Sequence, residues 1–158
     1  LIDFFLKDQK PQNWYHWAEV VWKDDTYPGY IGDMPHTWVG SDFLNAIRSM
    51  FVYENEWDKS LVLGAALYQD WIDAPQGMSV ENLPTYFGEI SYAIQKDQNK
   101  YVFKIWGDVK LPENGIKIQN FNASKMPSKV LLNGEPISNF SENVIQIQQF
   151  PAQVEIFY

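Results

Sequence analysis

Cysteine is absent from the sequence, histidine occurs only twice, and no long apolar run is present. Without cysteine the chain can form neither a disulfide nor a thiolate metal site. His16 and His36 are too few to build a zinc site on their own, so we expect no bound metal. No stretch of about 18 consecutive apolar residues occurs, and the sequence therefore predicts no membrane-spanning helix.

Positive charge is also scarce. The 158 residues include 12 Lys and Arg against 20 Asp and Glu, which gives a net charge of −8 and a pI near 4.6. A chain with this balance repels the phosphate backbone of nucleic acids and the anionic surface of a membrane. We therefore expect no nucleic-acid partner.

Aromatic residues, in contrast, are abundant. Phe, Tyr and Trp make up 16% of the sequence, with seven Trp, and hydrophobic residues reach 46%. Such a composition is typical of a folded globular chain with a real core. The many flat side chains either pack in that core or line a surface that takes a planar ligand, such as a sugar ring.

The composition changes near residue 55 and divides the sequence into residues 1–55 and 56–158. In the first part, apolar spacing predicts helices that end before Pro11 and that span 13–22 and 41–51, the last with Ser41 as its N-cap. Between them, Gly and Pro residues predict a long loop over 23–40.

The second part is typical of strands, because apolar and polar residues alternate there. Strands are predicted over 61–68, 86–95, 101–106, 116–121, 129–132, 144–148 and 154–158. Asp97-Gln98-Asn99 and Asn133-Gly134 are expected to be hairpin turns. With no helices between the strands, the pattern predicts an antiparallel β-sandwich, and the whole chain is α+β by segments.

Two short segments stand before the predicted helix at 41–51. They are residues 17–21 (WAEVV) and 32–38 (GDMPHTW). This order resembles the last hairpin of the six-hairpin α/α-toroid glycosidases of the glucoamylase-like and rhamnosidase-like groups. In glucoamylase-like members a short Ala-Glu segment carries the catalytic base, and an aromatic turn leads into the final inner helix. Rhamnosidase-like relatives continue into a C-terminal β-sandwich, and bacterial members carry a stretch similar to 83–92 (LPTYFGEISY) early in it.

The resemblance implies that the chain is the C-terminal part of a glycoside hydrolase, with the last helices of the toroid followed by the sandwich. The intact protein would cleave a glycan with two carboxyl groups and without a metal or organic cofactor. Glu19 would be the base, and the acid would lie on an upstream hairpin, so this chain alone would be inactive. The expected partners are a carbohydrate and the missing hairpins, or a second copy bound through exposed helix faces. The compartment stays open, with a bacterial periplasmic or extracellular location slightly favoured.

Five residues are candidates for this site. Glu19 is expected in a cavity rimmed by indoles, with Trp17 and Trp38 stacking on pyranose faces. Asp33 and His36 would contact sugar hydroxyls. Each has a simpler explanation: Glu19 can be a solvated helical residue, Asp33 a turn residue bonded to its own backbone, and His36 a packed side chain.

A second hypothesis is a non-catalytic carbohydrate-binding or structural module. Trp57, Trp71 and Trp106 of the sandwich could hold a glycan. Because they form no cluster in the sequence, we expect them rather to seal the sandwich against the helices.

Overall fold

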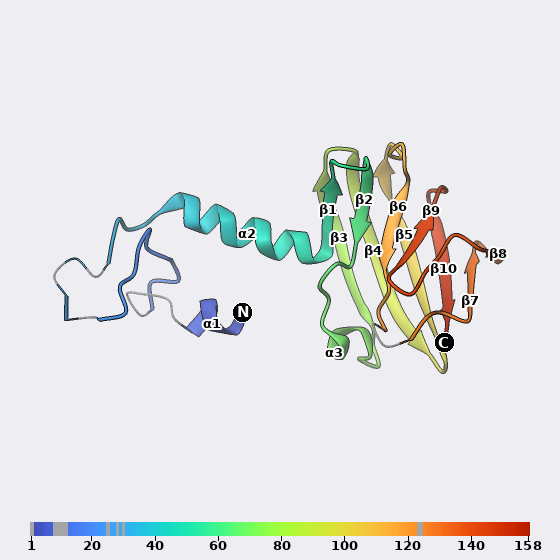
Figure 1. The fold of residues 1–158 in the computed structure, drawn as a ribbon, viewed down its shortest axis with the longest axis horizontal. Coiled ribbons are helices and arrows are strands. Elements are labelled where there is room, and N and C mark those ends of the chain that lie inside the picture. The colour runs from blue at the N-terminus through green and yellow to red at the C-terminus, as the bar shows by residue number, and fades with distance from the viewer. Residues whose placement is uncertain (1, 8–12, 25, 28, 30, 123–124) are drawn as a thin grey trace. The chain divides into compact units, whose positions relative to one another are not determined.

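The computed structural model describes residues 2–7, 13–24, 26–27, 29, 31–122 and 125–158. The chain divides into two compact units, Leu1–Ile47 and Arg48–Tyr158 (Figure 1). The boundary expected at residue 55 follows the change in composition. In the structure, residues 52–55 already form a strand that pairs with the next one, so this segment belongs to the second unit.

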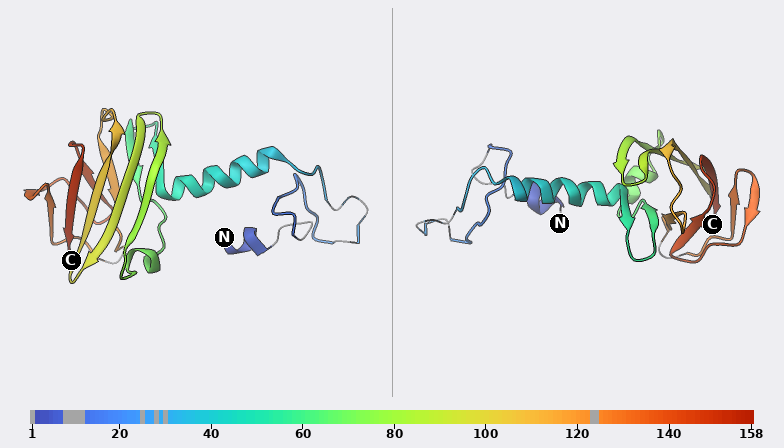
Figure 2. Two further views of the ribbon diagram at one scale, coloured as in Figure 1. Left: turned by 180° about the vertical axis from the view of Figure 1, so that it is seen from behind. Right: turned by 90° about the horizontal axis from the view of Figure 1, so that it is seen from above.

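The second unit is built from two sheets that lie face to face (Figure 2). The four-stranded sheet has the order β1-β2-β6-β9 and the six-stranded sheet the order β3-β4-β5-β10-β7-β8. The strands are β1 (Val52–Asn55), β2 (Ser60–Leu63), β3 (Met78–Thr85), β4 (Gly88–Asp97), β5 (Lys100–Val109), β6 (Ile116–Gln119), β7 (Lys129–Leu132), β8 (Glu135–Ile137), β9 (Val144–Ile147) and β10 (Ala152–Phe157). The prediction that this part is a β-sandwich is confirmed.

One strand pair departs from the predicted antiparallel arrangement. β2 and β6 run parallel, with Leu61 opposite Ile116 and Leu63 opposite Ile118. All the other pairs of named strands are antiparallel. The prediction that β2 and β6 are antiparallel was wrong. A parallel pair is joined by a long crossover connection, and the alternation of residues within one strand does not show which distant strand will pair with it.

β4 and β5 form a hairpin within the six-stranded sheet, and the alternation of their residues predicts such a hairpin with one face inward. Asp97 pairs with Lys100, so Gln98 and Asn99 make a two-residue turn, with φ 54° at Gln98. One face of the hairpin is buried, through Ile90, Tyr92, Ile94, Tyr101, Phe103 and Ile105. The Asn133-Gly134 turn likewise connects β7 to β8, with φ 50° and 88° at its two residues.

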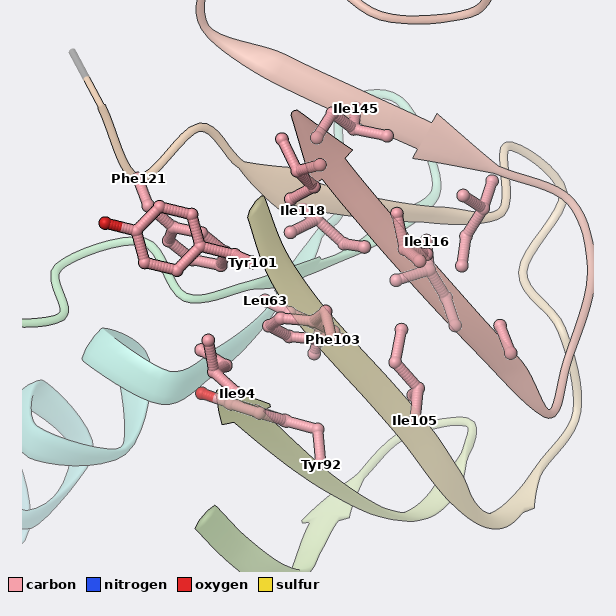
Figure 3. Close-up of a cluster of buried hydrophobic side chains, with 14 of the residues drawn as sticks. Leu63, Tyr92, Ile94, Tyr101, Phe103, Ile105, Ile116, Ile118, Phe121 and Ile145 are labelled. Carbon is pink, nitrogen blue, oxygen red and sulfur yellow. The ribbon is translucent and has the colours of Figure 1, made fainter. Parts of the chain in front are cut away.

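The core lies between the two sheets (Figure 3). Phe103 is fully buried at its centre. Its ring stacks on Tyr92 at 4.9 Å between centroids and on Phe121 at 5.7 Å. Aliphatic side chains of the four-stranded sheet close the opposite side, namely Leu61, Leu63, Ile116, Ile118, Ile145 and Ile147. Burial of this apolar area is the main source of stability for the unit.

Several predicted strand bounds were wrong. β2 ends at Leu63 and not at residue 68, because Gly64 has φ +71° and a short helix, α3 (Gln69–Ile72), follows. The sequence pattern missed β1 and β3. In β3, a register shift between Val80 and Leu83 and a positive φ at Asn82 interrupt the alternation. The strand predicted from residue 86 begins at Gly88, after the turn that joins β3 to β4.

A charged pair ties the start of the sandwich to the β3–β4 turn. The Arg48 guanidinium donates to both Glu54 carboxylate oxygens, at 2.7 and 3.1 Å, and to the Pro84 carbonyl at 2.6 Å. The Tyr86 amide donates to Glu54 Oε1 at 3.0 Å. Burial raises the pKa of Glu54, but these hydrogen bonds outweigh it and hold the pKa below its usual 4.5. The carboxyl is therefore ionised at neutral pH and joins β1 to the neighbouring turn.

The first unit contains α1 (Ile2–Lys7) and the beginning of α2 (Thr37–Phe51). The predicted end of the first helix at Pro11 lies outside the described residues. The predicted helix over 13–22 does not form: Asn13 and Tyr15 have positive φ, and Val21 makes a β-bridge with Ile31. Its Trp, Tyr, His and Val residues are mediocre helix formers, so pairing with a neighbouring segment decides its conformation.

α2 begins at Thr37, four residues before its predicted start, so the loop predicted over 23–40 ends at His36. The Gly40 amide donates to the His36 carbonyl at 3.3 Å, and Gly40 is accommodated inside the helix. Ser41 therefore lies in the second turn and is not the N-cap that we predicted. Among the described residues, no helix is long and apolar enough to cross a membrane.

Candidate functional site

The backbone places Glu19 beside Asp33. The Glu19 amide donates to the Asp33 carbonyl at 3.2 Å, and the Gly32 amide donates to the Val20 carbonyl at 2.7 Å. Gly32 permits this close approach, since a Cβ there would lie 3.1 Å from the Val20 nitrogen. Two candidate site residues from separate motifs thus lie on neighbouring chain segments.

Both acidic side chains at this crossing are exposed, whereas Ala18, the residue before Glu19, is buried. Glu19 was expected in a cavity rimmed by indoles. In the structure its side chain is exposed, as in a solvated carboxylate.

Trp17 is used for packing within the first unit. Its indole Nε1 donates to the Phe5 carbonyl at 3.1 Å, and its ring lies 4.3 Å from the ring of Phe43 on α2. The His16 Nδ1 accepts from the Trp17 amide at 3.0 Å. One side of the Trp17 ring is therefore covered by Phe43, which leaves less of it for a ligand.

His36 and Trp38 come together where α2 begins. Their rings meet edge to face, with centroids 5.8 Å apart and planes inclined by 70°. Trp38 is 76% exposed, so its indole is accessible. His36 Nδ1 is the one buried side-chain nitrogen or oxygen in the described residues without a hydrogen-bond partner. Such an unpaired buried atom costs about 1–3 kcal/mol unless a partner reaches it.

The structure therefore forms two local pairs among the five candidates: Glu19 with Asp33, through backbone atoms, and His36 with Trp38. The fifth candidate, Trp17, packs instead on Phe43, which was not a candidate. Within the described ranges, no hydrogen bond, ion pair or ring contact joins Glu19 to His36 or Trp38. The same part of the chain has no group of three or more His, Asp or Glu residues arranged to hold a metal ion.

An aromatic cluster on the sandwich was missed from the sequence. The Trp71 ring is parallel to that of Phe51 within 3°, at 6.0 Å, and Tyr68 lies 4.8 Å from Trp71 at 58°. We name Phe51, Tyr68 and Trp71 the α3 aromatic cluster. Phe51 is distant in sequence, and Tyr68 was assigned to a strand. The available signal was the three-residue spacing of Tyr68 and Trp71, which places two side chains on one helix face.

The other two sandwich tryptophans do not belong to this cluster. Trp57 is 99% exposed at the β1–β2 turn, so the expectation that it seals the sandwich is wrong. Trp106 lies on β5, opposite Ser91 of β4, and is 40% exposed.

Similarity to known proteins does not assign either group of residues. No family model matches the chain, and no curated protein or solved structure shows significant similarity to it.

Proposed function

We propose that the chain is the C-terminal part of a glycoside hydrolase of the six-hairpin α/α-toroid kind, with Glu19 as its general base. The observation that carries this proposal is the environment of α2. Its apolar residues recur at helical spacing, at Val39, Phe43 and Ile47, yet none of its residues is buried. An amphipathic helix of this kind normally packs its apolar face on a neighbour. The proposed neighbours are helices of the toroid that the chain does not contain.

The loop before α2 supplies the chemistry in this proposal. An inverting glycosidase needs one carboxylate to activate water and one carboxylic acid to protonate the leaving oxygen, about 6.5–9.5 Å apart. Glu19 is the base, and the acid comes from an upstream hairpin. Trp38 stacks on a pyranose face, while Asp33 and His36 contact hydroxyl groups. The unpartnered Nδ1 of His36 supports such a contact.

The unburied apolar residues of α2 predict association when the chain is alone. Light scattering of the 158-residue chain should give a mass above the 18.5 kDa of one copy, because exposed apolar faces favour self-association. A monodisperse monomer with all residues intact would contradict this expectation.

Glu19→Gln tests the catalytic role in the longer protein that the proposal requires. Removing the ionisable group while keeping the side-chain shape should lower glycan hydrolysis by at least about 100-fold. The rate would be measured by release of reducing sugar, with far-UV circular dichroism to verify folding.

The matched control is Glu135→Gln, which makes the same change at an exposed residue of β8. It should retain full activity. A folded Glu19→Gln protein that keeps more than about a third of the wild-type rate would rule out Glu19 as the base, since general-base catalysis contributes at least about 100-fold.

A second candidate function is a carbohydrate-binding module without turnover. The two exposed rings of the α3 aromatic cluster, Tyr68 and Trp71, favour it, because aromatic rings bind the apolar C–H faces of sugars. Under this hypothesis the chain binds oligosaccharide by itself, and Glu19 is not needed.

A further inference from the structure

The sequence contains two Asn-Gly pairs, Asn114-Gly115 and Asn133-Gly134, and both asparagines lie in turns. An asparagine before glycine can convert to aspartate without an enzyme, because glycine has no Cβ to hinder the attack of its backbone nitrogen on the asparagine side chain. Asparagine is accordingly one of the residues that proteins adapted to high temperature use sparingly. The two pairs have the same chemistry but different surroundings.

The Asn133-Gly134 pair is open to solvent. Both residues are exposed, and they connect β7 to β8, the strand at the edge of the six-stranded sheet. The Gly134 amide makes no hydrogen bond to any residue that the structure describes, and nothing lies within 4 Å of a Cβ built on Gly134. The attacking nitrogen is therefore unpaired, and there is room for the ring that its attack would close.

The side chain of Asn133 is held by Gln149 and by Gln153 of β10. Its Oδ1 accepts from the Gln153 amide at 2.8 Å, and its Nδ2 donates to Gln149 Oε1 at 3.0 Å. Attack on the side-chain carbon Cγ places negative charge on Oδ1, and a backbone N–H already aimed at that oxygen stabilises such charge. The side chain must still turn toward the Gly134 nitrogen, a local motion that an edge hairpin permits more readily than a central strand.

The Asn114-Gly115 pair is enclosed by comparison. Gly115 is buried, and its amide donates to the Pro112 carbonyl at 3.0 Å. A Cβ on Gly115 would lie 2.1 Å from the Ile147 carbonyl oxygen, so the backbone of β9 fills the space beside this glycine. The Asn114 Nδ2 donates to the Asp58 carbonyl at 2.6 Å. The Gly115 nitrogen is thus already bonded and has little room to approach the Asn114 side chain.

We propose that Asn133 is a site of spontaneous deamidation and that the fold protects Asn114. The Gly134 nitrogen loses its proton to a base in the solvent and bonds to the Asn133 Cγ, while the Cγ–Nδ2 bond breaks and Nδ2 takes up a proton and leaves as ammonia. Water then opens the cyclic imide at one of its two carbonyl groups, which leaves an aspartyl or an isoaspartyl residue at position 133. No oxidant or reductant is consumed.

The modification alters the β7–β8 turn in two ways. A carboxylate at position 133 cannot donate to Gln149, and it makes the net charge of −8 more negative. The isoaspartyl form also adds a backbone carbon to a two-residue turn whose residues have φ 50° and 88°. The modified β7–β8 hairpin should therefore exchange its amide hydrogens faster than the unmodified one. Unchanged exchange would contradict this loosening.

Peptide mass spectrometry of the folded 158-residue chain, incubated at mildly alkaline pH, tests the site. Trypsin cleaves after Lys and Arg, so it separates Asn114, in residues 111–117, from Asn133, in residues 130–158. Relative to a fresh sample, Asn133 should gain one mass unit, with isoaspartate in part of the product, while Asn114 stays unchanged. Gly134→Ala should slow the gain severalfold, because its Cβ hinders the nitrogen, with circular dichroism verifying that the variant folds.

The chain unfolded in urea is the control for the role of the fold, since both asparagines should convert there at similar rates. If Asn133 of the folded chain stays unmodified over a period that converts the unfolded chain, the proposal is overturned. Equal conversion of both asparagines in the folded chain would also overturn it, because the fold would then not protect Asn114. Aspartate without any isoaspartate, or an unchanged rate in folded Gly134→Ala, would exclude the cyclic imide.

Discussion

Replacing Phe103 with alanine is expected to lower the free energy of unfolding by about 3–5 kcal/mol. The side chain is fully buried, and its ring stacks on Tyr92 and Phe121. Because β5 lies inside the six-stranded sheet, the backbone around the resulting cavity cannot easily move to fill it. Urea unfolding followed by circular dichroism measures the loss.

Lys104→Ala is the control for this experiment, since Lys104 is the next residue of β5 and its side chain is exposed. It should change the free energy of unfolding by less than about 0.5 kcal/mol. A loss below about 1.5 kcal/mol for Phe103→Ala would show that the core can rearrange around the missing ring.

Gly88→Ala is expected to cost more than about 3 kcal/mol of unfolding free energy. Gly88 has φ +120°, and a Cβ there would lie 1.9 Å from the Asp108 carbonyl oxygen. Gly88 pairs with Val109 at the start of β4, so the clash is with backbone of the paired strand and not with a flexible side chain. Chemical unfolding would measure the effect, and the β4–β5 pairing would be followed by amide hydrogen exchange.

Gly134→Ala separates steric clash from backbone strain. Gly134 has φ +88°, but nothing lies within 4 Å of a Cβ built there. Its substitution should cost about 1–2 kcal/mol, from the strained backbone alone. Equal losses for the two variants would mean that the Asp108 carbonyl moves aside at no cost.

Strands with regular alternation were predictable from the sequence. Burial of one face from Ile90 to Ile105 follows directly from the side-chain period of two. The parallel pairing of Leu61 with Ile116 was not predictable, because it depends on how distant segments assemble. The helix expected over 13–22 is a predicted element that does not form. Trp14, Trp17 and Val21 have helical spacing, but pairing with residues 31–33 gives that segment another conformation.

Residue types and spacing in the sequence were enough to select Glu19 and Trp38 as candidates, and both side chains are exposed in the structure. The hydrogen bond between the Glu19 and Asp33 backbones depends on the path of the loop, for which the sequence contains no periodic signal. The meeting of Phe51 with Trp71 depends on the end of α2 lying beside α3, a tertiary contact.

The place of β10 in the six-stranded sheet affects how the protein is made in the cell. This last strand lies between β5 and β7 and hydrogen-bonds to both. Until residues 152–157 have left the ribosome during synthesis, one edge of β5 has no partner strand. The β7–β8 hairpin likewise lacks the strand that connects it to the rest of the sheet. The nascent chain therefore exposes an aggregation-prone strand edge until β10 emerges. A chain truncated before β10 would keep that edge exposed and would be a substrate for chaperones and proteases.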